Sequence, residues 1–143
     1  MRTQRRHDLG RAVLLAACLL VATAASAGPA QLAAAHQAPI PPGVALKSWQ
    51  DNGREGRYLL QIIEGKPLKA AQRIFGIVTT DTDCDADAQG LSHCHNVIKL
   101  ANGEQLTVID THNMHRNRCL GPGDQMTLTA VGGSWVMGTL LAR

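Results

Sequence analysis

Short apolar runs separated by turn residues fill the chain from residue 73 onward. Five of these runs are rich in Val, Ile, Thr and Leu, the composition and length typical of β-strands. They lie at residues 73–80, 96–100, 105–110, 125–131 and 134–141. The pattern predicts a mainly β domain in which each strand is short and its neighbour follows closely in sequence.

Turn residues indicate how these strands connect. Asn102-Gly103 and Gly132-Gly133 each separate two runs, and such pairs tolerate the positive φ of a type I′ hairpin turn. Pro122-Gly123-Asp124 predicts a turn that begins the fourth strand. Five short antiparallel strands favour a small closed barrel, because closure removes the unpaired edges that so small a sheet would expose.

Two barrel architectures fit this pattern, an OB-like and an SH3-like barrel. The connection at residues 112–124 offers room for one or two helical turns between the third and fourth strands. We favour an OB-like barrel with a shortened connection. Residues 46–72 precede it, and their apolar spacing around residues 58–63 fits either a short helix or a buried strand.

The beginning of the chain resembles a secretory signal peptide in its layout. Four arginines precede an uncharged apolar run at residues 12–25, too short to span a bilayer, and Ala25-Ser26-Ala27 offers a cleavage site. We therefore expect a signal peptide at residues 1–27, a flexible Ala- and Pro-rich leader at 28–45, a single barrel domain at 46–143, and a periplasmic or secreted location.

Two other readings of the first segment would change the destination. Leu15-Ala16-Ala17-Cys18 has the composition of a lipoprotein signal, and a lipid on Cys18 would anchor the protein to a membrane. Because the apolar run continues beyond Cys18, a soluble exported protein is favoured. Arg5-Arg6 is similar to a twin-arginine signal, but Asp8 stands where that signal prefers an apolar residue.

The net charge of +3 comes from the segment that export would remove. Residues 1–27 hold four of the 14 basic and one of the 11 acidic residues, which leaves 10 of each in the remaining chain. That chain is neutral, so charge gives no support for a nucleic-acid partner. Only Trp49, Tyr58, Phe75 and Trp135 are aromatic, too few for a base-stacking surface. Another envelope protein or a metal ion is the expected partner.

Three cysteines remain after residue 27, namely Cys84, Cys94 and Cys119. An exported protein usually meets an oxidising compartment, and three pairings are open. We favour a Cys84–Cys94 disulfide, which would join the loop between two strands, and a free Cys119.

Histidine supplies the densest candidate chemistry. His93 and His95 stand at the entrance to the second strand, and His112, His115 and Cys119 follow the third. Because these strands form a hairpin, the two groups should be neighbours at its open end. Imidazole and thiolate are the ligands that zinc and copper prefer, so the five residues form a candidate Cu or Zn site. Solvent-facing loop histidines without a metal are the alternative.

A second candidate site is acidic. Asp81, Asp83, Asp85 and Asp87 alternate along the chain as in the beginning of a calcium loop. Ala86 stands where an EF-hand needs glycine, so a looser calcium loop or a solvated acidic segment remains.

Cys119 also suggests a catalytic hypothesis, since Arg116 and Arg118 would stabilise its thiolate and a histidine lies nearby in sequence. The chain contains no GxSxG, HExxH or phosphate-cradling glycine motif. We therefore rank an exported metal-binding module first, an envelope structural or protein-interaction domain second, and a thiol-dependent enzyme third.

Overall fold

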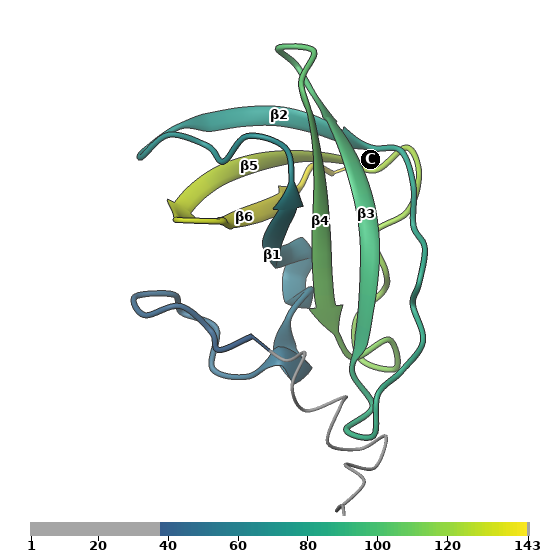
Figure 1. Cartoon of the computed structure of the whole chain (residues 1–143). Coiled ribbons are helices and arrows are strands. Elements are labelled where there is room, and N and C mark those ends of the chain that lie inside the picture. The colour runs from purple at the N-terminus through teal and green to yellow at the C-terminus, as the bar shows by residue number, and fades with distance from the viewer. Residues whose placement is uncertain (1–37, 143) are drawn as a thin grey trace, which may run out of the picture.

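Six antiparallel strands form a closed barrel in the computed structural model, which describes residues 38–142 (Figure 1). The strands are β1 (Arg57–Glu64), β2 (Arg73–Val78), β3 (Ser92–Leu100), β4 (Gln105–His112), β5 (Gln125–Gly132) and β6 (Trp135–Leu140). Around the barrel they follow the order β1-β4-β3-β2-β5-β6, and β6 pairs with β1 to close it. Two short 3₁₀ helices, η1 (Trp49–Asp51) and η2 (Arg54–Gly56), precede β1.

The predicted small antiparallel barrel is confirmed, but the number of strands is six instead of five. The additional strand is β1, in the segment whose pattern fitted either a helix or a strand. Its residues Tyr58, Leu60 and Ile62 face the interior, whereas Leu59 joins an apolar cluster on the outside. Because both faces of β1 are partly covered, its apolar residues do not alternate cleanly with polar ones, which hid the strand in the sequence.

The other five strands connect as an OB-like barrel would. In space β5 lies beside β2, which lies beside β3 and then β4, and this is the arrangement of a Greek key. OB-folds are Greek-key barrels. Here β1 is inserted between β4 and β6 and completes the closure.

The turn between β3 and β4 differs from the predicted type I′. Gly103 has a φ of 86°, but Asn102 keeps a negative φ, and the Gly103 N–H donates to the Leu100 carbonyl. The Asn102 side chain instead accepts a hydrogen bond from the Glu104 N–H. The result is a longer loop that needs the left-handed conformation only at glycine.

Inward-facing residues of β3 and β4 divide the hairpin into two halves. Near the turn, Ile98 pairs with Leu106 and both belong to the apolar barrel core. Toward the open end, Cys94 pairs with Asp110 and Ser92 with His112, and all four are buried. The barrel interior is therefore apolar at one end of this hairpin and polar at the other.

The segment before β1 packs on the outside of the barrel. Trp49 stacks on Trp135 of β6 with ring centroids 5.8 Å apart, and its indole N–H donates to the Ala38 carbonyl. Ile40 and Val44, from the predicted leader, join the same apolar cluster.

The predicted signal peptide, Cys18 and the first part of the leader lie outside the described residues. Within residues 38–142 there is no helix with the length and apolar character that a membrane span requires.

Candidate functional site

The alternation of strand residues separates the histidines that the sequence grouped together. β3 begins at Ser92, so His93 and His95 lie within it, with their side chains on the face opposite to Cys94. His112 is the last residue of β4, and its side chain is completely buried. His115 lies in an exposed turn after β4, where its N–H is held by the Asn113 side chain.

The two outward histidines have partners of their own. His93 Nε2 lies 3.0 Å from Asp87 Oδ2, and its Nδ1 lies 3.0 Å from Thr111 Oγ1. His95 Nδ1 lies 3.3 Å from Asp83 Oδ2. Among residues 38–142, the predicted set of four histidines and Cys119 contains no three donors that gather closely enough to share an ion.

Three of the four aspartates of the candidate calcium loop, Asp81, Asp83 and Asp87, also have different partners. Asp87 Oδ1 accepts hydrogen bonds from the Gln89 and Leu91 N–H groups. Burial alone would raise the pKa of Asp87, but these two bonds and the contact with His93 outweigh it and lower the pKa. Asp83 contacts His95, whereas Asp81 Oδ1 accepts a hydrogen bond from Asn96 Nδ2 at 3.0 Å. In the described part of the chain, these carboxylates form no cluster around a common point.

Sulfur atoms, in contrast, are brought together. The predicted disulfide between Cys84 and Cys94 is confirmed, and Cys119 is a free cysteine. The Sγ atoms of all three lie within 4.8 Å of one another. Within residues 38–142 they are the one group of three His, Cys, Asp or Glu donors that are this close.

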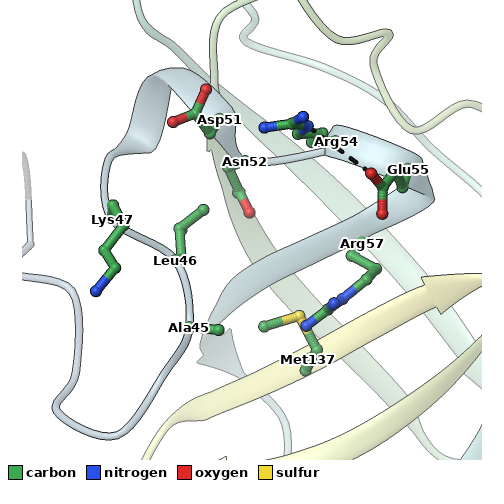
Figure 2. A pocket seen from close by; sticks show the side chains of 9 residues that line it. All are labelled: Ala45, Leu46, Lys47, Asp51, Asn52, Arg54, Glu55, Arg57 and Met137. Atoms are coloured by element: carbon green, nitrogen blue, oxygen red, sulfur yellow. Dashed lines mark ion pairs between the residues drawn. The ribbon is translucent and has the colours of Figure 1, made fainter.

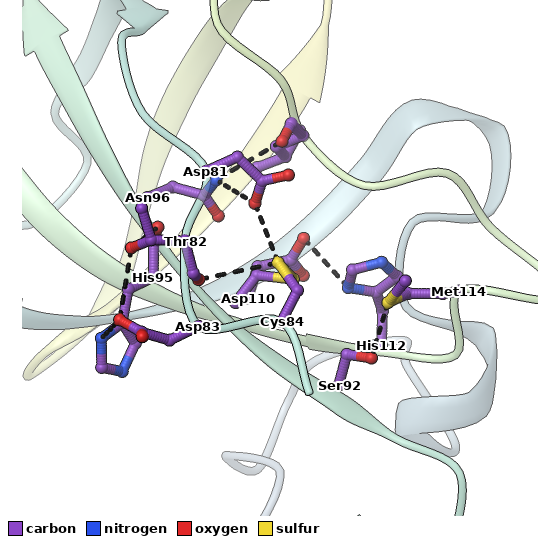
Figure 3. Close-up of a disulfide and its surroundings, with 12 residues drawn as sticks. Asp81, Thr82, Asp83, Cys84, Ser92, His95, Asn96, Asp110, His112 and Met114 are labelled. Carbon is purple, nitrogen blue, oxygen red and sulfur yellow. Dashed lines mark hydrogen bonds and ion pairs between the residues drawn. A yellow bond between two sulfur atoms is a disulfide. The ribbon is translucent and has the colours of Figure 1, made fainter. Parts of the chain in front are cut away.

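Three separate segments position these sulfurs, and Figure 3 shows the disulfide and its surroundings. Cys94 is fixed on the inner side of β3 and is fully buried. The segment before β3 runs antiparallel to it, because Thr82 pairs with His95 through two backbone hydrogen bonds, which places Cys84 beside Cys94. Cys119 comes from the connection between β4 and β5, and like Cys84 it is half-buried.

A buried acid–base pair lies next to the sulfurs. His112 Nδ1 and Asp110 Oδ2 are 3.2 Å apart, and both side chains have no exposed surface. Burial raises the pKa of Asp110, against the opposing effect of His112. Burial alone would lower the pKa of His112, but the adjacent Asp110 carboxylate outweighs it and raises the pKa. Both shifts favour retention of a proton by the pair.

The surroundings of Cys119 are the reverse of those predicted. Burial raises the pKa of its thiol, and the charges of Asp81 and Asp110 add to the effect. Arg118 opposes it only weakly, because its guanidinium binds the Asp124 carboxylate at 2.7 and 3.1 Å. Arg116 pairs instead with Asp51 at 3.5 Å. The prediction that flanking arginines activate this thiol is therefore wrong.

Two asparagines that the sequence did not single out hold the site together. Asn96 Nδ2 donates to Asp81 Oδ1, and it also lies within hydrogen-bond distance of the carbonyls of Thr80 and Leu120. It thereby links the residues that precede Cys84 and follow Cys119. Asn52, buried behind the barrel wall, donates from Nδ2 to Asp110 Oδ1 at 3.3 Å. A buried Asn at an inward strand position is the signal that could have identified Asn96.

A small surface pocket lies elsewhere on the barrel (Figure 2). It lies between the pre-β1 segment, Arg57 of β1 and Met137 of β6, and has a volume of about 200 Å³. Its wall carries both signs of charge, and Arg54 lies 3.9 Å from Glu55. This volume is below the range typical of small-molecule sites.

No family model, curated protein or solved structure matches this chain.

Proposed function

We propose that this chain is an exported binding module that takes a thiophilic metal ion, Zn²⁺ or Cu⁺, through Cys84, Cys94 and Cys119 when the disulfide is reduced. The observation that carries the proposal is the approach of the three Sγ atoms to within 4.8 Å of one another. Thiolates about 2.3 Å from a tetrahedral zinc ion lie about 3.8 Å apart. Small movements of two loop cysteines would therefore complete such a site.

The choice of metal follows from the donors. Soft thiolates select Zn²⁺ and Cu⁺ over the hard ions Ca²⁺ and Mg²⁺. The Asp81 carboxylate, whose Oδ1 lies 3.2 Å from Cys84 Sγ, offers an oxygen beside the three sulfurs. Since thiols must lose their protons to bind a metal, the raised pKa of Cys119 makes affinity increase with pH.

The disulfide gates this site. It withholds two of the three thiolates, so the oxidised protein presents Cys119 alone, and a dithiol reductant converts it to the binding form. A disulfide is consistent with an oxidising compartment, and the basic and apolar residues 1–27 support export. Expression of the full chain in a bacterium, followed by mass measurement of the envelope fraction, tests that part: loss of residues 1–27 is expected.

Metal titration tests the binding site itself. The protein is reduced with a phosphine under anaerobic conditions, and Zn²⁺ is titrated in competition with a chromophoric chelator. We expect one ion per reduced chain, at least tenfold weaker binding in Cys119→Ser, and no comparable binding by the oxidised protein. Absence of binding by the reduced protein would overturn the proposal.

The double variant His93→Gln/His95→Gln is the matched control. Both imidazoles lie on the outer face of β3, so their removal should leave the affinity unchanged. If this variant loses the metal and Cys119→Ser keeps it, the histidine site predicted from the sequence is correct and the cysteine site is wrong.

A further inference from the structure

The oxidised protein places a free thiol beside its own disulfide. Cys119 Sγ lies within 4.8 Å of both Cys84 Sγ and Cys94 Sγ. A thiol that reaches a disulfide can displace one of its two sulfurs through direct attack. This chemistry concerns the oxidised, metal-free chain and is independent of the metal-binding function proposed above.

The contacts of Cys84 indicate which thiol the site stabilises after exchange. Asp81 Oδ1 lies 3.2 Å from Cys84 Sγ, yet a disulfide sulfur has no proton to donate to that oxygen. Asn96 Nδ2 holds the same oxygen in place at 3.0 Å. The carboxylate is therefore positioned as an acceptor for a Cys84 thiol, a state that the Cys84–Cys94 disulfide does not use.

The remaining two cysteines suit the alternative bond. Cys94 is fixed on β3 and buried, whereas Cys119 lies in the connection between β4 and β5. That connection is tied to the barrel next to Cys119, because Arg118 binds Asp124 and the Arg118 carbonyl accepts a hydrogen bond from the Tyr58 hydroxyl at 2.8 Å. A Cys94–Cys119 disulfide would join two well-anchored segments and would free the loop cysteine.

We infer that the protein interconverts two disulfide isomers, Cys84–Cys94 and Cys94–Cys119, by attack of Cys119 on Cys94. The Cys94–Cys119 bond forms as the Cys84–Cys94 bond breaks, and the proton of Cys119 ends on Cys84. The number of disulfides and thiols does not change, so the step needs no external oxidant or reductant. Its product presents the half-exposed Cys84 thiol, hydrogen-bonded to Asp81, and removes the covalent link between the acidic loop and β3.

Disulfide mapping of the oxidised protein tests the inference. The chain is purified without reductant, held at mildly alkaline pH, quenched in acid and alkylated in denaturant. Cleavage after Arg and Lys separates Cys119 from the other cysteines, and cleavage at Asp85 and Asp87 separates Cys84 from Cys94. We expect linked Cys94 and Cys119 fragments together with alkyl label on Cys84.

Three variants make the result decisive. Cys119→Ser should reduce the label on Cys84 to background, and Cys84→Ser should form the Cys94–Cys119 disulfide without a remaining thiol. Asp81→Ala, which removes the acceptor, should shift label from Cys84 to Cys119. Label confined to Cys119 in the unaltered chain, or two free thiols in air-oxidised Cys84→Ser, would overturn the inference. Neither result bears on zinc binding by the reduced protein.

Discussion

The two halves of the β3–β4 hairpin bury cross-strand pairs of opposite character. In the turn half, Ile98 faces Leu106, and their contact contributes to the apolar core. In the open half, Cys94 faces Asp110 and Ser92 faces His112. Apolar pairs gain free energy from burial, whereas a buried ionisable pair must first offset the loss of its hydration.

The apolar half supplies stability, whereas the open half holds the reactive groups. Within the described chain, His112 Nδ1 and Nε2, Asp110 Oδ2 and Asn96 Oδ1 are buried without a geometrically good hydrogen bond. All of these atoms belong to the open half or its immediate neighbour. Buried polar atoms without a hydrogen bond are rare in protein interiors. The open half therefore lowers the free energy of unfolding, and burial of the apolar half offsets this loss.

The largest effect should come from removal of one member of the buried pair. Asp110→Ala leaves His112 buried without its carboxylate and should destabilise the protein by about 3 to 5 kcal/mol. Urea unfolding followed by tryptophan fluorescence measures the change. The double variant Asp110→Leu/His112→Leu, which removes both charges together, should lose much less; an equal loss would show that the pair itself stabilises the fold.

An apolar truncation in the other half should have the next largest effect. Ile98→Ala deletes buried methyl groups from the core and should cost about 3 kcal/mol, of which part reflects the cavity left behind. The matched variant Ile98→Val should cost about 1 kcal/mol. If Ile98→Ala cost less than 1 kcal/mol in the same urea assay, the turn half would not be the principal source of stability.

Loss of the disulfide should have a smaller effect than either. Cys84→Ser/Cys94→Ser opens a loop of sequence separation 10 and should lower the free energy of unfolding by about 2 to 3 kcal/mol, mainly by freeing the unfolded chain. Cys119→Ser keeps the disulfide and should change stability by less than about 1 kcal/mol. Thermal unfolding of the three proteins without reductant provides the comparison.

The smallest predicted effect is a dependence on pH. Both Asp110 and His112 have pKa values raised above the ordinary 3.8 and 6.5, so the folded state keeps protons that the unfolded chain releases. Stability from this pair is therefore fully present below the unfolded pKa values and is lost as pH rises through the folded ones. The urea midpoint should fall as the pH rises above the ordinary histidine value of about 6.5.

The variant Asp110→Asn/His112→Gln should remove most of this decline. His95→Gln, which changes an imidazole on the outer face, should retain it. A rise in the urea midpoint over the same pH interval in the unaltered protein would contradict the raised pKa values.

Much of the barrel could be predicted from the sequence because its strands follow local signals. Alternating β-branched residues and the glycine-containing turns give β2 to β6, with errors at the strand ends only. β3 begins four residues earlier than predicted because Ser92, His93 and Cys94 are not strong strand formers, and pairing with β4 decides their conformation. β1 was ambiguous because its apolar residues lie on both faces, with Tyr58 and Leu60 inside the barrel and Leu59 in the outer cluster.

The candidate site could be predicted only in part. The Cys84–Cys94 pairing followed from the predicted loop, but the approach of Cys119 depends on how the connection after β4 folds back over the barrel end. The histidines that were expected to be neighbours do not gather at one point. Once β3 and β4 extend through residues 92–112, side-chain alternation directs His93 and His112 to opposite faces, and sequence spacing alone does not reveal how far a strand extends.

Closure of the barrel has a consequence for synthesis of the chain. Of the strands in residues 38–142, β1 leaves the ribosome first, yet it pairs with β4 and with β6, where Arg57 meets Thr139. Pairing between residues so distant in sequence slows folding, because the loop must close before the contacts form. β1 and its apolar residues therefore stay without their final partner until β6 has been synthesised.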